Sequence, residues 1–168
     1  MTTLREQYPL ESIKPLKKTI GFAFIIIIIV VAFSIFFYIT TLSESNNLSN
    51  FSPGLIFLLA ILLMVLLIVL KYIYEVIYMK NYFYDNTGDN LVIRKGVFSI
   101  NEITLPFTRI QDVYVDQDIL DRIFGLYDVH VSSATNISGV LSHIDGLNSA
   151  NSNAVRDLIL KKIKEYGR

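Results

Sequence analysis

The sequence predicts a membrane protein in which two transmembrane helices are followed by a small, mainly β domain that ends in an amphipathic helix. Three observations support this fold class. Hydrophobic residues make up 52% of the 168 residues, and the mean hydropathy of +0.48 is high for a soluble domain. Nearly all of this excess lies before residue 80. After it, short strand-like runs alternate with turn residues, and the chain closes on a helical apolar period.

Two apolar segments are long enough to cross a membrane. The first, residues 19–41, contains no charged residue, and the second, residues 54–79, holds the run LIFLLAILLMVLLIVL. About 20 apolar residues in a helix span the hydrocarbon core of a bilayer. Neither run has a polar face, which argues against two buried helices of a soluble core. The first run is also longer than the apolar region of a signal peptide.

Basic residues flank the two segments on one side only. The link between them, residues 42–53, contains no Lys or Arg. The other flanks contain Arg5, Lys14, Lys17, Lys18, Lys71 and Lys80. By the positive-inside rule, both termini face the cytoplasm and the link faces outward. Ionisable residues are absent from 19–43 and 45–70, so the spans are predicted to anchor the chain rather than to transport a solute.

These features predict five regions in the cytoplasmic membrane. They are a cytoplasmic N-terminal tail (1–18), a first transmembrane helix (19–41), an extracytoplasmic loop (42–53), a second transmembrane helix (54–79) and a cytoplasmic domain (80–168).

The first half of the domain is predicted to contain a hairpin and a third strand. NYFYD and LVIRK flank NTGDN, whose Asn, Gly and Asp residues favour a tight turn. VFSINEITL follows as the next strand. Its apolar residues change parity between Ile100 and Ile103, which predicts a β-bulge near Asn101–Glu102.

The second half of the domain is predicted to contain further strands. RIQDVYVDQ has strand character, and YDVHVSS alternates so that Tyr127, Val129 and Val131 point inward and Asp128 and His130 outward. NISGVLSHIDGL predicts another hairpin, around Gly139.

The final segment is predicted to be an amphipathic helix. Its apolar stripe comprises Ala154, Val155, Leu158, Ile159, Ile163 and Tyr166. Two interpretations are open: the helix covers the open end of a curved sheet, or it lies on the membrane. The first is preferred because a small sheet needs the stripe to complete its core.

The stretch DRIFGL is predicted to form one helical turn between two strands. Ile119, Leu120, Ile123 and Phe124 are expected to face inward, and Gly125 permits a left-handed exit. Arg122 has two interpretations: a structural contact with Asp118, Asp121 or the carbonyls of this turn, or a contact with an anion or partner. The same two interpretations apply to Arg109, for which Asp112, three residues later, is the candidate structural partner.

The segment LPFTRIQDVYVDQDILDRIFGLYDVHVSSA resembles the bacterial pleckstrin-homology-like (PH-like) domain of YdbS-like membrane proteins. The matching elements are Leu105-Pro106, Arg109-Ile110-Gln111 with Val113, Leu120 with Arg122, Phe124-Gly125-Leu126 and Ile144-Asp145-Gly146-Leu147. SSAT at 132–135 departs from the family pattern. The resemblance implies two N-terminal spans and a partly open β-barrel, here of about six or seven strands, with a C-terminal helix. It also implies a binding module rather than an enzyme.

Motifs for chemistry are missing from the sequence. There is no cysteine and no nucleophile elbow, zinc-protease motif or nucleotide-binding loop, so we expect no enzyme activity, cofactor or metal. The acidic residues Asp112, Asp116, Asp118 and Asp121 lack calcium-loop spacing and are read as a solvated rim. No basic run carries interleaved aromatics, so nucleic acid is not an expected partner.

Binding of a protein partner is the preferred function. Residues 80–168 carry ten basic and eleven acidic side chains, and the predicted first turn is acidic, which disfavours phosphoinositide recognition. The sequence therefore predicts a membrane-anchored scaffold that binds another membrane protein or forms a homo-oligomer. Sensing of lipid headgroups is the alternative, and a membrane-bound enzyme or transporter fits less well. The candidate contact residues are Arg94, Lys95, Arg109 and Arg122.

Overall fold

A computed structural model describes residues 2–43, 53–133 and 142–166. The chain forms two compact units. One combines residues Met1–Lys17 with Val76–Arg168, and the other comprises Lys18–Glu75. Residues at both ends of the sequence thus build the same unit, and the apolar segments are inserted between them.

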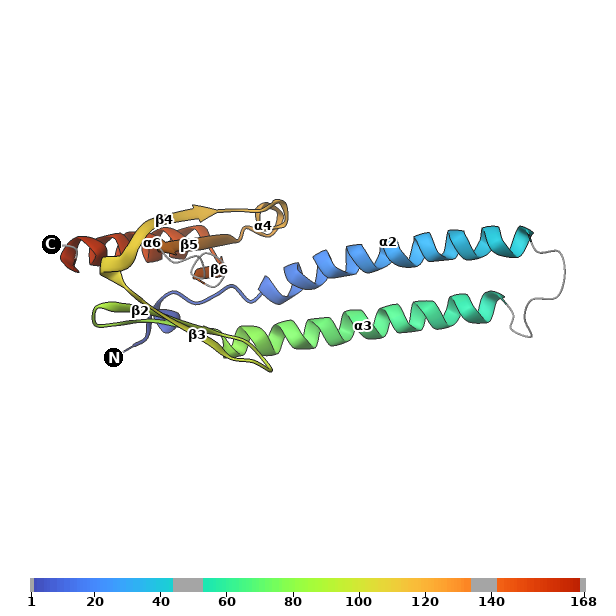
Figure 1. The fold of residues 1–168 in the computed structure, drawn as a ribbon, viewed down its shortest axis with the longest axis horizontal. Coiled ribbons are helices and arrows are strands. Elements are labelled where there is room, and N and C mark those ends of the chain that lie inside the picture. The colour runs from blue at the N-terminus through green and yellow to red at the C-terminus, as the bar shows by residue number, and fades with distance from the viewer. Residues whose placement is uncertain (1, 44–52, 134–141, 167–168) are drawn as a thin grey trace. The chain divides into compact units, whose positions relative to one another are not determined.

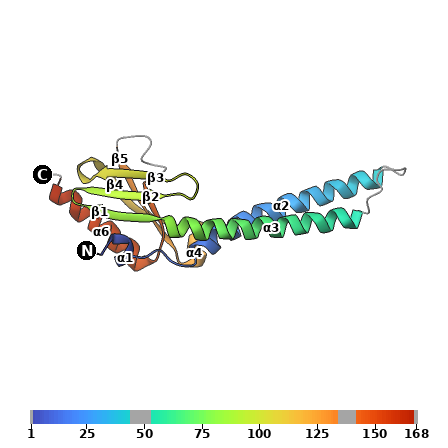
Figure 2. The same cartoon turned by 90° about the horizontal axis from the view of Figure 1, so that it is seen from below.

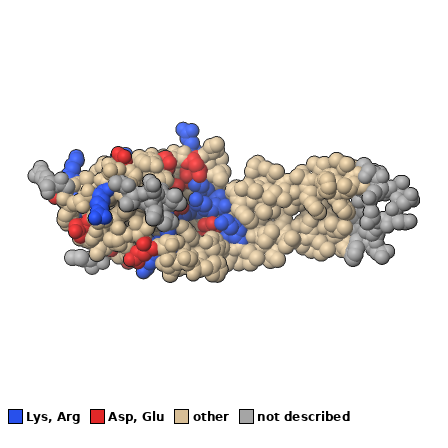
Figure 3. Space-filling model, viewed as in Figure 1, with Lys and Arg blue, Asp and Glu red and all other residues tan. Residues whose placement is uncertain are grey.

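Helices α2 (Lys14–Ser43) and α3 (Pro53–Asn81) contain the two predicted spans (Figure 1). By length and composition both can cross a membrane, and no part of their most apolar stretches is buried inside the protein. Phe24 is 66% exposed and Leu62 57% exposed, as expected of side chains that face lipid rather than a protein core. On the face seen in Figure 3, most of the surface of the two helices is uncharged, whereas Lys, Arg, Asp and Glu gather over the unit that contains the strands.

The strands form two antiparallel three-stranded sheets (Figure 2). The first sheet contains β1 (Phe83–Thr87), β2 (Asn90–Lys95) and β3 (Asn101–Pro106). The second contains β4 (Ile110–Asp116), β5 (Tyr127–Ser133) and β6 (His143–Leu147). A 3-10 turn, η1 (Phe107–Arg109), connects them. Among the strands that the structure describes, β3 pairs only with β2 and β4 only with β5, so the sheets do not close into the barrel that the resemblance implied.

The predicted pairing of the first three strands is present, but the predicted bulge is not. Thr87 pairs with Asn90, and Gly88 has a φ of 62° in the tight turn between them. Register between β2 and β3 is regular from Asn90↔Pro106 to Lys95↔Asn101. The change of parity instead arises before β3, in a bend where Phe98 is 94% exposed. Strand β6 pairs with β5, while the hairpin predicted around Gly139 lies outside the described residues.

Helix α6 (Ser149–Tyr166) packs on the domain, as the preferred interpretation predicted. It contacts β4, β5 and η1. Val155 and Ile159 are fully buried and join a core built from both sheets. Val129 and Val131 of β5 point into the same core as predicted, whereas Asp128, predicted to face outward, is half-buried. The centre of the apolar stripe is therefore buried inside the protein, while Tyr166 at its end is 40% exposed.

Helix α4 (Ile119–Phe124) is the predicted helical turn, but only Leu120 and Phe124 of its four predicted inward residues are half-buried. Asp118 caps its N-terminus, and Gly125 ends it at a φ of 66°. Ile119 and Ile123 are 81% and 68% exposed. The physical reason is that the helix turns Asp121, which is 1% exposed, toward the domain, so the face carrying the two isoleucines points outward.

Residues 2–17 form an N-terminal arm that belongs to the domain. Its short helix α1 (Leu4–Gln7) begins with a capping box between Thr3 and Glu6. Leu4 and Leu10 are buried in the core. The hydroxyl of Tyr84 donates to the backbone oxygen of Tyr8, which holds the arm against β1. The sequence predicted only a cytoplasmic tail for this segment, because its contacts are with residues far away in the chain.

Candidate functional site

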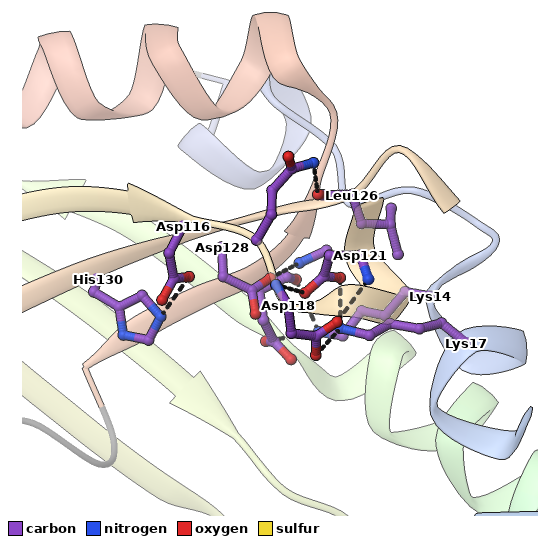
Figure 4. Close-up of polar contacts among 11 residues, drawn as sticks. Lys14, Lys17, Asp116, Asp118, Asp121, Leu126, Asp128 and His130 are labelled. Carbon is purple, nitrogen blue, oxygen red and sulfur yellow. Dashed lines mark hydrogen bonds and ion pairs between the residues drawn. The ribbon is translucent and has the colours of Figure 1, made fainter. Parts of the chain in front are cut away.

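Two buried lysines join the N-terminal arm to the domain (Figure 4). Lys14 Nζ donates to Asp145 Oδ1 at 2.8 Å and to the Asp145 backbone oxygen at 3.0 Å. Lys17 Nζ lies 2.5 Å from Asp121 Oδ1 and 2.9 Å from Asp118 Oδ2. Both lysines are nearly inaccessible to solvent. Their ammonium groups therefore depend on these carboxylates, because a buried charge without a partner is costly.

The capping box of α4 explains how its aspartates reach Lys17. Asp118 Oδ1 accepts a hydrogen bond from the Asp121 backbone N–H at 2.6 Å, and Asp121 Oδ2 accepts one from the Asp118 backbone N–H at 3.3 Å. Although partial burial opposes ionisation of Asp118, the hydrogen bonds from the Asp121 backbone and from Lys17 lower its pKa. One of the acidic residues predicted to form a solvated rim, Asp121, is therefore buried and structural instead.

Asp128 lies beside this network (Figure 4). Its Oδ1 accepts a hydrogen bond from the Gly146 backbone N–H at 2.8 Å. Burial and the negative charge of Asp145 raise the pKa of Asp128 to about 6, against the opposing effect of the Gly146 hydrogen bond. The carboxyl group is therefore ionised at neutral pH and protonated in mild acid.

Asp116, Asp128 and His130 offer a group of ligand-type atoms on the second sheet. These atoms lie within 4.8 Å of one another. His130 Nε2 is 3.1 Å from Asp116 Oδ1, and the His130 ring stacks on Tyr114 at 4.9 Å. The contacts within the group and with Gly146 account for its arrangement, and nothing further assigns a metal to it.

A basic cavity of about 550 Å³ lies where the arm, the end of α3 and the first sheet meet. Three of its lining residues are cationic: Arg5 from α1, Lys80 from α3 and Arg94 from β2. Arg94 is one of the predicted contact residues. The sequence identifies Arg5 and Lys80 only as basic residues that flank the apolar segments. No local sequence pattern indicates that either of them lies beside Arg94.

The four predicted contact residues do not come together. Lys95 is only 5% exposed and lies under the surface, with Nζ 5.8 Å from the centre of the Tyr82 ring. Arg109 is exposed beside a second cavity of about 490 Å³ between β3 and β4. Arg122 is exposed on α4. Their role as contacts with a partner stays a prediction.

The ion pair expected between Arg122 and Asp118 or Asp121 is not among the contacts of the described residues, and whether Arg122 has a structural or a partner-binding role stays a prediction. Asp118 and Asp121, its expected partners, are bound by Lys17, and among the described residues Arg122 forms no ion pair. Sequence reasoning missed Lys17 because 104 residues separate it from Asp121. In addition, the positive-inside rule already explains a lysine beside the first apolar segment, so nothing in the sequence suggested a second role for Lys17.

Comparison with known proteins gives one family. A family model described as Bacterial PH domain matches residues 10–163. The matched range contains both apolar helices and the six strands that the structure describes. Searches of curated proteins and of solved structures found no significant match.

Proposed function

The chain belongs to the bacterial PH domain family, and from this premise we propose that it is a membrane-anchored, non-enzymatic binding module. Its PH-like domain mediates protein interaction or self-assembly at the cytoplasmic face of the membrane. Family membership supports a binding role, since PH-like domains are generally binding modules rather than catalysts. The exposed apolar surfaces of α2 and α3 support the anchor.

The observation that carries this proposal is the open corner between the two sheets. Strands β3 and β4 each lack a second neighbour among the strands described, and η1 connects them. The cavity at this corner is lined by Thr104, Leu105, Arg109 and Gln111, among others. An exposed strand edge presents backbone N–H and C=O groups to which a strand from another chain can be added. Arg109 supplies a charge that can select the partner.

Because the domain is tethered to the membrane, a weak contact at this corner is sufficient for assembly. Two chains confined to one membrane meet at a high effective concentration, so modest affinity per contact still produces assembly. This agrees with a site that consists of an edge and one arginine rather than a deep apolar pocket.

Native mass spectrometry of the full-length chain, released in a mild detergent, tests the proposal. We expect a dimer or higher oligomer, or one stoichiometric second protein. Thr104→Lys places a charge on the exposed edge of β3 and should dissociate the assembly. Asn153→Lys, at an exposed position on α6 away from the strand edges, is the matched control and should leave it intact. A wild-type chain that is monomeric and without a partner would contradict the proposal.

Recognition of lipid headgroups is a second candidate function, and the basic cavity favours it. Arg5, Lys80 and Arg94 line one space, whereas the domain as a whole is nearly neutral. A monomer that retains a defined phospholipid in the same experiment would support this candidate over protein interaction.

A further inference from the structure

Arg5 lines the basic cavity, and one of its guanidinium nitrogens is a buried donor without a hydrogen-bond partner among the described residues. Its Nη2 donates to the Met79 backbone oxygen at 3.3 Å. Its Nη1 is buried and has no hydrogen-bond partner among the residues that the structure describes. Leaving a buried charged donor unsatisfied costs more than the same hydrogen bond contributes when it is made. Nη1 itself is buried, so Arg5 contributes its positive charge to the cavity rather than this donor, and a neighbouring anion would compensate that partly buried charge.

Two more cations line the same space. Lys80 and Arg94 are both exposed, so their charges are accessible from solvent. The Arg94 guanidinium lies 5.1 Å from the centre of the Phe83 ring, and the two residues are paired in the register of β1 and β2. This stacking orients the guanidinium plane before a ligand arrives.

The acidic residue of the cavity does not cancel these charges. Glu6 also lines the space, but its Oε2 accepts a hydrogen bond from the Thr3 backbone N–H at 3.0 Å as part of the α1 capping box. Three cations and one carboxylate leave an excess of two positive charges around the cavity. The site therefore favours an anion, and one with more than a single negative charge.

The hydrogen-bond donors around the cavity, two guanidinium groups and one ammonium group, favour an anion of the phosphate class. Guanidinium groups hold phosphate oxygens through forked hydrogen bonds, and an ammonium group adds a compact charge. The volume of about 550 Å³ accommodates more than one inorganic phosphate. Ile100, which is 63% exposed, lines the same cavity and offers apolar contact beside the cations.

We propose that Arg5, Lys80 and Arg94 form a binding site for a phosphoryl group. The group is supplied either by a phospholipid headgroup or by a free phosphate compound. The site lies apart from the open corner between β3 and β4, so this inference does not depend on protein interaction at that corner.

Binding is measured on the full-length chain in a maltoside detergent. In the first arm, inorganic phosphate and pyrophosphate are titrated by calorimetry. In the second arm, phosphatidylglycerol is added and its retention is measured by native mass spectrometry. Arg5→Gln and Arg94→Gln each remove one cation of the site. Lys164→Gln, an exposed position on α6 outside the cavity, removes the same charge elsewhere and is the control.

We expect saturable binding in at least one arm. Each cavity variant should weaken it by about tenfold or more, as loss of one charge-assisted hydrogen bond predicts, while Lys164→Gln binds as the wild type does. Binding of pyrophosphate without retained lipid identifies a free phosphate compound, and retained lipid identifies a headgroup. Absence of binding in both arms overturns the proposal. So does equal binding by the wild type and Arg94→Gln, whose exposed side chain can be changed without loss of folding.

Discussion

Lys14 Nζ lies 2.8 Å from Asp145 Oδ1, although 131 residues separate the two in the sequence. Their side chains are 2% and 7% exposed. The Lys14 ammonium also lies 4.2 Å from the centre of the Tyr82 ring, which supplies a further favourable contact for the cation. This ion pair ties the N-terminal arm to β6, the last strand of the domain.

Lys14→Met should strongly destabilise the domain. The substitution keeps the aliphatic bulk but leaves the Asp145 carboxylate buried without its cation, which costs about 3 kcal/mol or more. Thermal unfolding in detergent, followed by tyrosine fluorescence, measures the loss. The double variant Lys14→Met/Asp145→Leu should recover much of it, because both charges are then absent. If the single and double variants unfold at the same temperature, the pair is not the source of the stability.

Gly146→Ala should disturb the Lys14–Asp145 ion pair by placing a Cβ atom against the Lys14 side chain. Gly146 has a φ of 84°, and an added Cβ would lie 2.5 Å from Lys14 Cδ. Gly88 has a φ of 62° with nothing within 4 Å of such a Cβ, so Gly88→Ala isolates the conformational cost of about 1 kcal/mol. We expect Gly146→Ala to lose at least about 2 kcal/mol, through that cost plus displacement of a tied lysine. Equal losses in denaturant unfolding of the two variants would contradict the predicted clash.

Asp128 should make the domain less stable as pH rises through mild acid. Its pKa is about 6 in the folded chain, against 3.8 for an unperturbed aspartate, chiefly because it is buried and close to Asp145. Between these two values the folded state holds a proton that the unfolded chain releases. Stability at this position is therefore lost as pH rises toward 6, by on the order of 2 kcal/mol.

Asp128→Asn tests this prediction because it keeps an acceptor for the Gly146 N–H but cannot ionise. Melting temperatures measured between pH 4 and pH 7 should fall with rising pH in the wild type and change less in the variant. Asp157→Asn, at an exposed position on α6, should retain the wild-type dependence. A variant whose profile parallels that of the wild type would assign the dependence to other groups.

Lys17 and Arg122 should differ sharply in their effect on stability. Lys17→Met leaves Asp121 buried without a cation and should cost about 3 kcal/mol. Arg122→Met removes an exposed side chain that forms no ion pair among the described residues, and should change stability by less than about 0.5 kcal/mol. Chemical unfolding of the two variants in the same detergent makes the comparison. A comparable loss in Arg122→Met would restore the role that the sequence suggested for it.

Local patterns were sufficient to predict most of the elements. The long apolar runs, the Thr87–Asn90 turn, the alternation in β5 and the stripe of α6 all depend on residues close together in sequence. Gly125 ended the turn of α4 at the expected residue because a left-handed exit is a local requirement.

The remaining features depend on residues far apart in the sequence. The inward face of α4 could not be predicted, because it is set by Lys17, which is 104 residues away from Asp121. Ile119 and Ile123 look like core residues in the sequence, and the buried ion pair overrides their hydrophobicity. The cavity lined by Arg5, Lys80 and Arg94 could not be predicted from the sequence either, because its three cations come from three separate elements.

The arm also has a consequence for synthesis of the chain. Lys14 is made 131 residues before Asp145, and Glu11, whose backbone N–H donates to Gly146 O, is made earlier still. At typical translation rates the arm waits on the order of ten seconds for its partners. During that interval the lysines remain hydrated, and the two apolar helices can leave the ribosome before the domain is complete. The contacts between the arm and β6 can therefore form only after both apolar helices have been synthesised.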